Sequence, residues 1–374
     1  MPSMWRQPLA IVTIGGVQVD CEEVTVDQAK KAESGKCSFI APLTAMEAVG
    51  LGLDWIADAE EDSVQVTFST GEGDDTVMFT GTVDKADVDI TLEGQPVTIS
   101  CRDKSSDMHS SRTNEKFINQ KSEEIVKTIA ARHGLTLVTD GGTAMAGSIY
   151  TAEQAHLTSN QTEWSLCQQL ATKEGKVLFI VGVKLYFKKI DDSSLPTYPI
   201  VYTPPSVDGF ASVTGPSFDV VKLKLGRNYK AAKDTTVNVK SWDHKKKQLV
   251  TSTQTASGAG GPSQTYDYYP HHLTQEAADH LAKGKAKEHT RHEFDLTIEM
   301  PGDLTLTPLF QIALSGTNSK FDQNYAIDHI SHKITQPKGG GRGGGQGGAG
   351  HGGSGGYAMS ITTKAAKKGR NKDD

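Results

Sequence analysis

The sequence has few cysteines, and none of them lies in a recognisable binding motif. The four residues form no Cys-x-x-Cys pair, so their spacing predicts neither a zinc site nor a disulfide-rich secreted domain. We expect buried, reduced thiols, which are typical of a protein that assembles in a reducing cytoplasm. These cysteines are Cys21, Cys37, Cys101 and Cys167.

Long apolar runs are also missing. No stretch of about 18 apolar residues occurs in the chain, which argues against a transmembrane helix. Residues 1–14 lack the charged start and the apolar centre of a signal peptide. We therefore expect no membrane insertion by this chain.

Catalytic signatures are absent as well. The sequence has no His-Glu-x-x-His and no Gly-x-Ser-x-Gly. Histidines gather at 271–292, where His289 and His292 could share a helix face as metal ligands do. The alternative is a set of polar surface or capping histidines. Among 45 acidic residues a carboxylate pair for glycan cleavage can always be found, so such a pair carries no weight. We expect a protein that is not an enzyme and that uses no cofactor or metal.

No single sign of charge dominates the chain, whose net charge is −6. A protein that grips nucleic acid usually has a basic face, but here the basic residues are scattered except in the tail at 364–374. Two short acidic runs stand out, and one interpretation is that both are solvated turns. The runs are Asp58, Glu60, Glu61 and Asp62, and then Glu72, Asp74 and Asp75.

The hydrophobic pattern predicts two strand-rich regions. Residues 8–105 alternate with period two between turn residues, and alternating strands return after about residue 212. Short strands with regular turn signals indicate a barrel or a sandwich. One short helix is expected over 44–56, with Thr44 and Glu47 as a capping box.

An α+β module is expected between the two regions. A helix at 122–133, capped by Ser122, and a helix at 162–174 have apolar faces. A hairpin follows around Gly182, and a further helix is expected at 274–291 with Thr274 as its cap. Residues 339–356 contain 13 glycines in 18 positions, which predicts a flexible segment that cannot pack a core.

Two stretches of the α+β module resemble signatures of one phage family. The first, SCRDKSSDMHSSR…INQKSEEIVKTIAARHGL, carries a strand that ends in Arg-Asp and a helix that ends in His-Gly-Leu. The second, NQTEWSLCQQLATKEGKVLFIVGVKLYF, carries a Trp near its start and Glu-Gly after its helix. The residues that match are Arg102, Asp103, His133, Gly134, Trp164 and Gly175.

A third stretch, LTPLFQIALSGTNSKFDQNYAIDHISHKI, resembles the last strands of the same family through Tyr325 and His332. Leu309 stands where that family often has glycine. His329 and His332 are three apart on a predicted strand, so they face opposite sides and cannot bind one ion together.

In this order, the three stretches resemble the phage late control D and Mu-like tail protein P family over residues 10–363. This is the baseplate hub of contractile tails, and its fold is shared with the N-terminal part of type VI secretion spike proteins. The resemblance implies an α+β, mainly β fold with two tail-tube-like β-barrels and an external α+β module. The implied ranges are 1–103 for the first barrel, 104–211 for the module, 212–363 for the second barrel with the insert 339–356, and 364–374 for a basic tail.

The resemblance also implies a function in the virion. Such a hub is a homotrimer in the tail baseplate, assembled in the host cytoplasm, that joins a sixfold tail tube to a threefold membrane-piercing spike. Its partners are the spike, the tail tube, the baseplate wedges and the tape measure protein, and DNA passes through without specific binding during genome ejection. In such a conduit the two acidic runs would line the lumen and repel phosphate. The alternatives are the hub of a phage-derived injection particle, pyocin or type VI-like, and a tail-associated peptidoglycan hydrolase.

Overall fold

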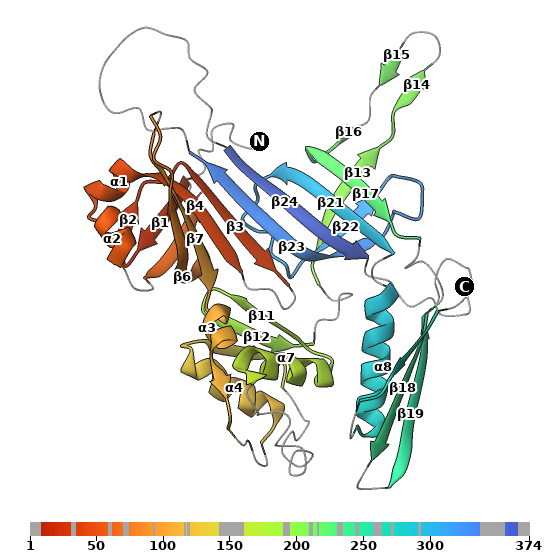
Figure 1. The fold of residues 1–374 in the computed structure, drawn as a ribbon. Helices are drawn as coiled ribbons and strands as arrows, with labels where there is room; N and C mark the ends of the chain where they lie inside the picture. Colours follow the sequence, from red (N-terminus) through yellow and green to blue (C-terminus); the bar gives the residue numbers. More distant parts are fainter. Residues whose placement is uncertain are drawn as a thin grey trace.

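The computed structural model describes most of the chain and is mainly β, as the sequence predicts (Figure 1). No helix in the described ranges is long and apolar enough to cross a membrane. The described residues are 9–30, 35–58, 62–69, 75–92, 94–115, 117, 120–141, 161–189, 195–208, 212–214, 217–229, 235–243, 247–256, 264–270, 273–290, 293–336 and 356–365.

The first set of strands follows the period-two alternation of the sequence. Along its first strand the side chains of Ala10, Val12 and Ile14 are buried, because successive side chains of a strand point to opposite faces. The antiparallel order is β2-β1-β5-β6-β7-β4-β3. The bounds are β1 Leu9–Ile14, β2 Val17–Val19, β3 Glu23–Ala29, β4 Lys36–Pro42, β5 Ser63–Ser69, β6 Thr76–Val88 and β7 Pro96–Asp103.

The prediction of a single helix over 44–56 is wrong. The chain forms two short helices instead, α1 (Leu43–Ala48) and α2 (Leu53–Asp58). Gly50 lies between them with φ of +84°, a left-handed conformation that favours glycine and ends a helix. Pro42 is the N-cap residue of α1, so Thr44 lies inside the helix and is not the cap.

The α+β module packs α4 and α7 against a small sheet of order β11-β12-β9. Here the predicted cap is wrong: Ser122 is the first helical residue, and Lys121 precedes it with its N–H donated to Glu124 at 2.9 Å. The bounds are α3 Ser105–Ser110, β8 Arg112–Thr113, α4 Ser122–Arg132, β9 Thr136–Thr139, β10 Gln161–Thr162, α7 Glu163–Glu174, β11 Val177–Val181 and β12 Lys184–Lys188.

The second set of strands begins earlier than the sequence indicated. Strand β13 pairs with β22 of this set, so residues 197–203 belong to the large sheet, whereas the α+β module was expected to reach residue 211. The bounds are β13 Thr197–Thr203, β16 Ser217–Phe218, β17 Lys222–Arg227, β21 Phe294–Pro301, β22 Gln311–Ser315, β23 Asn324–Thr335 and β24 Gly356–Ala365. Strands β14 (Ser206–Asp208) and β15 (Ser212–Thr214) form a separate two-stranded sheet.

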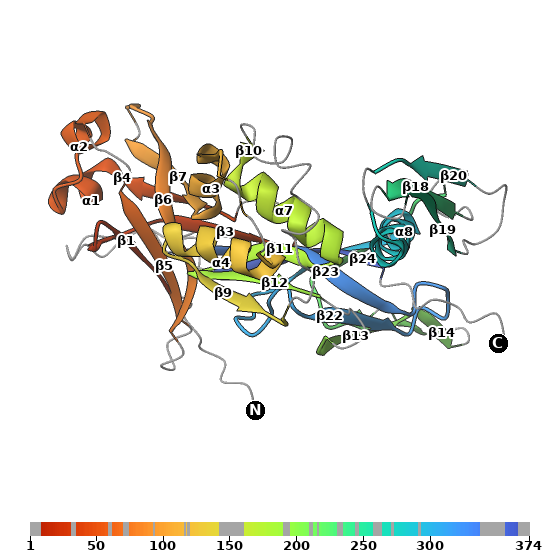
Figure 2. The same ribbon diagram turned by 90° about the horizontal axis from the view of Figure 1, so that it is seen from below.

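The third helix belongs to a small unit with its own core, not to the second set of strands as expected. Strands β18 (Thr235–Asp243), β19 (Gln248–Ala256) and β20 (Gln264–Tyr268) form a separate sheet. Helix α8 (Gln275–Thr290) covers it, and Thr274 accepts a hydrogen bond from the N–H of Ala277 at 3.3 Å, as predicted for its cap. Figure 1 shows this unit extending away from the large sheet, and Figure 2 shows it from below, to one side of the molecule.

Strand β23 joins the two sets into one sheet. Along one edge it pairs with β24 from 325 to 335. Along the other edge it pairs with β22 at 324–326 and then with β3 at 329–335. The resulting 14-stranded sheet closes no barrel among the described strands, so two closed barrels stay a prediction.

The two sets share one arrangement. The order β3-β4-β7-β6-β5 in the first set matches β17-β21-β24-β23-β22 in the second, and every neighbouring pair in both is antiparallel. The chain therefore contains the same five-strand unit twice.

Ile334 tests how firmly the two sets are joined. It lies on β23, yet it is buried in the core of the first set. We expect Ile334→Ala to lower the free energy of unfolding by about 2–5 kcal/mol, because it leaves a cavity. The exposed Leu249 gives a control, for which Leu249→Ala should change it by less than about 0.5 kcal/mol. Urea unfolding measures both, and equal losses would contradict the assignment.

Candidate functional site

Three of the seven acidic residues proposed for a lumen lie in the described chain, and they form no single patch. Asp62 precedes β5 and Asp75 precedes β6, so the two lie at opposite ends of an antiparallel hairpin. Asp62 accepts a hydrogen bond from Trp55 Nε1 at 2.8 Å, and Asp58 is exposed at the end of α2. A lumen position stays a prediction. Outside the described residues lie Glu60, Glu61, Glu72 and Asp74.

The first motif ends in a buried carboxylate that ties two loops together. Asp103 accepts the N–H of Gly35 at 2.7 Å, and it accepts both the N–H and the hydroxyl of Ser105, at 3.0 and 2.5 Å. Burial raises the pKa of Asp103, while these hydrogen bonds oppose that rise. The neighbouring Arg102 forms an ion pair with Asp84 of β6 at 2.8 Å. The motif thus holds the β3–β4 turn against the start of the α+β module.

The first two motifs meet at Glu163, a residue that is not among those matching the family signatures. Glu163 is buried at the start of α7, and its Oε2 lies 2.5 Å from His133 Nε2. Its Oε1 lies 2.8 Å from Arg132 Nη1, and the same arginine also contacts Glu115. The end of α4 is therefore fixed to the start of α7 by charge-assisted hydrogen bonds.

The remaining motif residues of the module are structural. Gly134 and Gly175 follow α4 and α7 with φ of +65° and +64°, which confirms that each glycine ends its helix. Trp164 is buried, and its ring centroid lies 5.2 Å from that of His109. The predicted inner face of α7 is confirmed by the buried Cys167 and Leu170 beside it.

The third motif lies on β23 and faces inward. The buried Tyr325 donates its hydroxyl to the carbonyl of Phe321 at 3.0 Å, and burial raises its pKa to about 12. His332 is fully buried, whereas His329 is partly exposed, with Nε2 3.7 Å from Asp27 Oδ1. The prediction that the two histidines face opposite sides is confirmed.

His332 lies where the cores of the two sets meet. Its Nδ1 is 2.8 Å from the hydroxyl of Tyr357, and Phe68 packs edge-on against both rings, at centroid distances of 6.4 and 5.7 Å. No hydrogen-bond partner of its Nε2 is found in the described part of the chain. Burial lowers the pKa of His332 to about 4; the charge of Asp303 opposes this shift and His329 adds to it. The ring is therefore neutral near pH 7.

Among the residues that take part in these contacts and were missed from the sequence are Glu163, Phe68 and Tyr357. A signal existed for Glu163, because it stands between the cap Thr162 and Trp164 inside the second motif. Tyr357 and Phe68 carried no local signal. Both meet His332 only through pairing of strands far apart in the sequence.

The other candidates from the sequence form no reactive site among the described residues. His289 stacks on Tyr266 at 4.0 Å and hydrogen-bonds the hydroxyl of Tyr268 at 2.9 Å. No group of three His, Cys, Asp or Glu side chains is placed to hold a metal ion within the described ranges. All four cysteines are buried and form no disulfide, and burial raises the pKa of Cys21 to about 12. Outside the described residues lie His271, His272 and His292.

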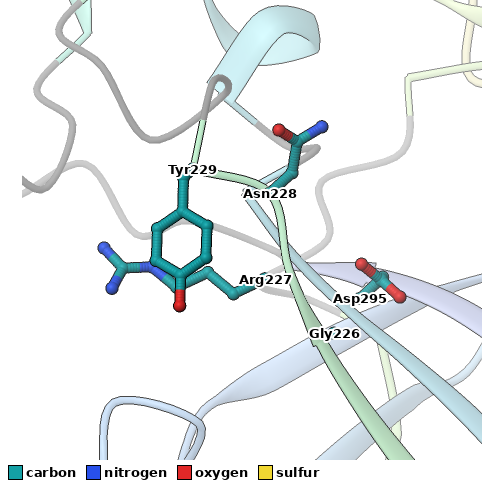
Figure 3. A pocket seen from close by; sticks show the side chains of 5 residues that line it. All are labelled: Gly226, Arg227, Asn228, Tyr229 and Asp295. Atoms are coloured by element: carbon teal, nitrogen blue, oxygen red, sulfur yellow. The ribbon is translucent and has the colours of Figure 1, made fainter.

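An open hollow of about 550 Å³ lies at the edge strand β17 (Figure 3). Gly226, Arg227, Asn228 and Tyr229 line it together with Asp295 of β21. The guanidinium of Arg227 lies 5.2 Å from the Tyr229 ring centroid. A Cβ at 226 would come within 2.3 Å of the Asp295 carboxylate, so a larger residue there would need the Asp295 side chain to move.

Comparison with known proteins gives one family. Residues 63–336, more than half of the chain, match the family model described as the Alg8 N-terminal domain. The chain belongs to the Alg8 N-terminal domain family. A search of curated proteins finds no match to this Alg8 N-terminal domain family member.

Solved structures similar to this Alg8 N-terminal domain family member include three tail proteins. The tail protein from Neisseria meningitidis MC58 aligns with a TM-score of 0.66 at 12% identity, over 96% of both chains. The prophage MuSo2 43 kDa tail protein from Shewanella oneidensis gives 0.61 at 12%, over 95% of this chain and 97% of that one. Prophage tail protein gp18 from Listeria monocytogenes EGD-e gives 0.54 at 12%, over 98% and 95%. The chain therefore has the fold of phage tail proteins.

Glu163 gives a test of the contact between α4 and α7. We expect Glu163→Ala to lower the free energy of unfolding by about 1.5–3 kcal/mol, because His133 and Arg132 lose a charged acceptor. Glu276 is exposed on α8, so Glu276→Ala should change stability by less than about 0.5 kcal/mol. Urea unfolding distinguishes the two, and an unchanged Glu163→Ala variant would contradict the role given to this residue.

His332 gives a pH dependence with a defined sign. Its pKa in the folded protein, about 4, lies below the usual value of 6.5, so the unfolded chain binds the proton more tightly. The contribution of the neutral His332 ring to the free energy of unfolding is fully present above pH 6.5. As pH falls toward 4 this contribution is lost, which lowers the free energy of unfolding by roughly 3 kcal/mol.

The variant His332→Phe should lack this part of the acid destabilisation, whatever its stability at pH 7. Urea unfolding at pH 7 and pH 4.5 measures the difference. The exposed His280 on α8 provides the matched control, since His280→Gln leaves the buried His332 and the loss of stability that depends on it in place. An identical pH dependence in His332→Phe and wild type would refute the assignment.

Proposed function

We propose that the protein is a structural hub of a contractile phage tail baseplate, of the kind that the phage late control D and Mu-like tail protein P family forms. Three copies form a ring that joins a sixfold tail tube to a threefold spike. The ring encloses the conduit through which DNA and the tape measure protein pass. The spike, the tube and the baseplate wedge proteins bind around it, and the chain performs no catalysis.

The duplicated five-strand unit carries this proposal. Each copy presents two similar sets of strands, β3-β4-β7-β6-β5 and β17-β21-β24-β23-β22. A closed ring of three copies therefore presents six similar units around a threefold axis. Such a ring matches a sixfold partner on one side and a threefold partner on the other. The fold shared with tail proteins over nearly the whole chain supports the same role.

The hub of a phage-derived injection particle is the second candidate. The E. coli c3393 protein is described as a component of the type VI secretion system with structural similarity to the T4 phage tail proteins gp27 and gp5. It aligns with 96% of this chain and 77% of its own length, at a TM-score of 0.50 and 12% identity. The particle's nature follows from the genes beside this one, and the ring is common to both candidates.

The mass of the purified protein tests the proposal. Light scattering over a range of concentrations should give a species of about 120 kDa, three times the 40.1 kDa chain. Electron micrographs of that species should show six similar lobes around one opening. A chain that stays monomeric at every concentration, or forms a two-fold dimer, would contradict a hub. Clearing of peptidoglycan in a zymogram would instead favour the hydrolase.

A further inference from the structure

The two five-strand units match residue by residue at an irregular point. In β6 the ladder with β7 skips Asp84, and in β23 the ladder with β24 skips Asp328. Each skipped aspartate forms an ion pair with a basic residue of the neighbouring strand. Arg102 pairs with Asp84 at 2.8 Å, and Lys364 pairs with Asp328 at 2.6 Å. Residues 83–91 of the first unit are therefore equivalent to residues 327–335 of the second.

The edge strands of the two units match in the same way. Following the ladders outward from Arg102 and Lys364, Asp27 of β3 is equivalent to Gly226 of β17. Residues 23–29 are thus equivalent to residues 222–228. In the chain, residues 329–335 pair with residues 23–29 of β3. The equivalent pairing, of residues 85–91 with residues 222–228, is not made within the chain.

Residues 85–91 and residues 222–228 each have one edge that pairs with no described strand. The ladder of β6 with β5 ends at Thr82, and the equivalent ladder of β23 with β22 ends at the equivalent Ala326. Beyond Ala326, β3 occupies that side of β23, whereas no described strand occupies it beyond Thr82. Strand β17 likewise pairs with β21 alone within the described chain.

Apolar side chains in the same two segments are exposed to solvent. Ile90 is 66% exposed, although its equivalent Ile334 is 0% exposed under β3. On β17, Leu225 is 37% exposed, whereas its equivalent Val26 is 0% exposed. Tyr229, two residues after this strand, is 76% exposed. Apolar side chains thus remain in water where the equivalent positions are covered within the chain.

We propose that residues 85–91 of one copy, the last part of β6 and the three residues after it, pair antiparallel with residues 222–228 of a second copy, β17 and the residue after it, in the register of the β23–β3 ladder. The proposal rests on the hub described above, because it names the surface through which the copies join. Ile90 would lie opposite Leu223, and Val88 opposite Leu225. The segment would enter beside the hollow lined by Gly226 and Arg227 (Figure 3).

Charge favours this register. Within the chain, Lys333 of β23 forms an ion pair with Glu23 of β3 at 2.8 Å. The equivalents of these residues are Asp89 and Lys222, which carry the same pair of charges with the signs exchanged. Asp89 also lies directly opposite Lys224 in the proposed register. Opposite charges across neighbouring strands stabilise a pairing, and like charges destabilise it.

The positions of the two segments favour a ring. Figure 1 shows β6 and β17 on opposite flanks of the molecule. Two different surfaces of each copy are used, so the contact is head-to-tail, and such contacts build rings when the rotation closes. The ring would also cover strand edges that otherwise invite uncontrolled pairing.

Cysteine cross-linking tests the proposed register. Asp89→Cys and Lys224→Cys place thiols on exposed, directly opposite positions, and the four native thiols are buried. A mixture of the two single variants should give an oxidised dimer, whereas neither variant alone should. The double variant should give a covalent trimer. Asp89→Cys mixed with Lys184→Cys, on the exposed end of β12, is the control and should give no dimer.

Reversing the charges gives a second measurement. Asp89→Lys and Lys224→Asp should each weaken self-association about three- to tenfold, as followed by sedimentation, because each places like charges opposite one another. The two single variants, once mixed, should recover association at the repaired contact. Lys184→Asp should leave association unchanged.

The outcomes separate this interface from the hub itself. A threefold mass with the 89–224 cross-link supports both. A threefold mass without that cross-link overturns the interface and leaves the hub standing. A self-linked dimer of Asp89→Cys alone would show a two-fold contact and overturn the interface. A chain that never associates overturns both.

Discussion

The ladder between β23 and β3 is the interaction on which the rest of the molecule depends. It joins strands that lie about three hundred residues apart in the sequence, and it places Ile334 of the second set in the core of the first. The α+β module contacts the large sheet through Asp103 at the end of β7, so its position follows from that sheet. Without this ladder the two sets would each expose a strand edge and an apolar row to water.

An irregularity makes this ladder possible. The skipped residue Asp328 shifts the alternation of β23 by one, so that Tyr325 and Ile327 face inward before it and Ile330 and Ile334 face inward after it. A strand with strict alternation would turn one of these pairs toward solvent. Bulges bend a strand and increase its twist, and here the bend lies where β23 leaves β22 and meets β3. The same irregularity at Asp84 shows that this device is part of the repeated unit.

The joint between the two sets, where their cores meet at His332, buries polar groups, and this costs free energy. His332 and Tyr357 lie between two apolar cores, and they satisfy each other through one hydrogen bond. Burying a neutral imidazole costs less free energy than burying its cation, so acid destabilises the joint between the two sets. The ion pairs around the two skipped aspartates are more exposed to solvent, and they define the register more than they add to the stability.

The sequence by itself determined the local elements. Period-two alternation defined the strands, Gly134 and Gly175 fixed the ends of two helices, and the absence of Cys-x-x-Cys pairs is in keeping with the buried free thiols that the structure shows. Local patterns also misplaced some features. The apolar stripe over 44–56 predicts one continuous helix, but Gly50 divides this stretch into two short helices. Only the tertiary structure decided that β13 belongs to the second set, that α8 covers a separate sheet, and that Glu163, Phe68 and Tyr357 meet the motif residues. The reason is physical: alternation tells which face of a strand is buried, but it does not tell which distant strand covers that face or completes its hydrogen bonds.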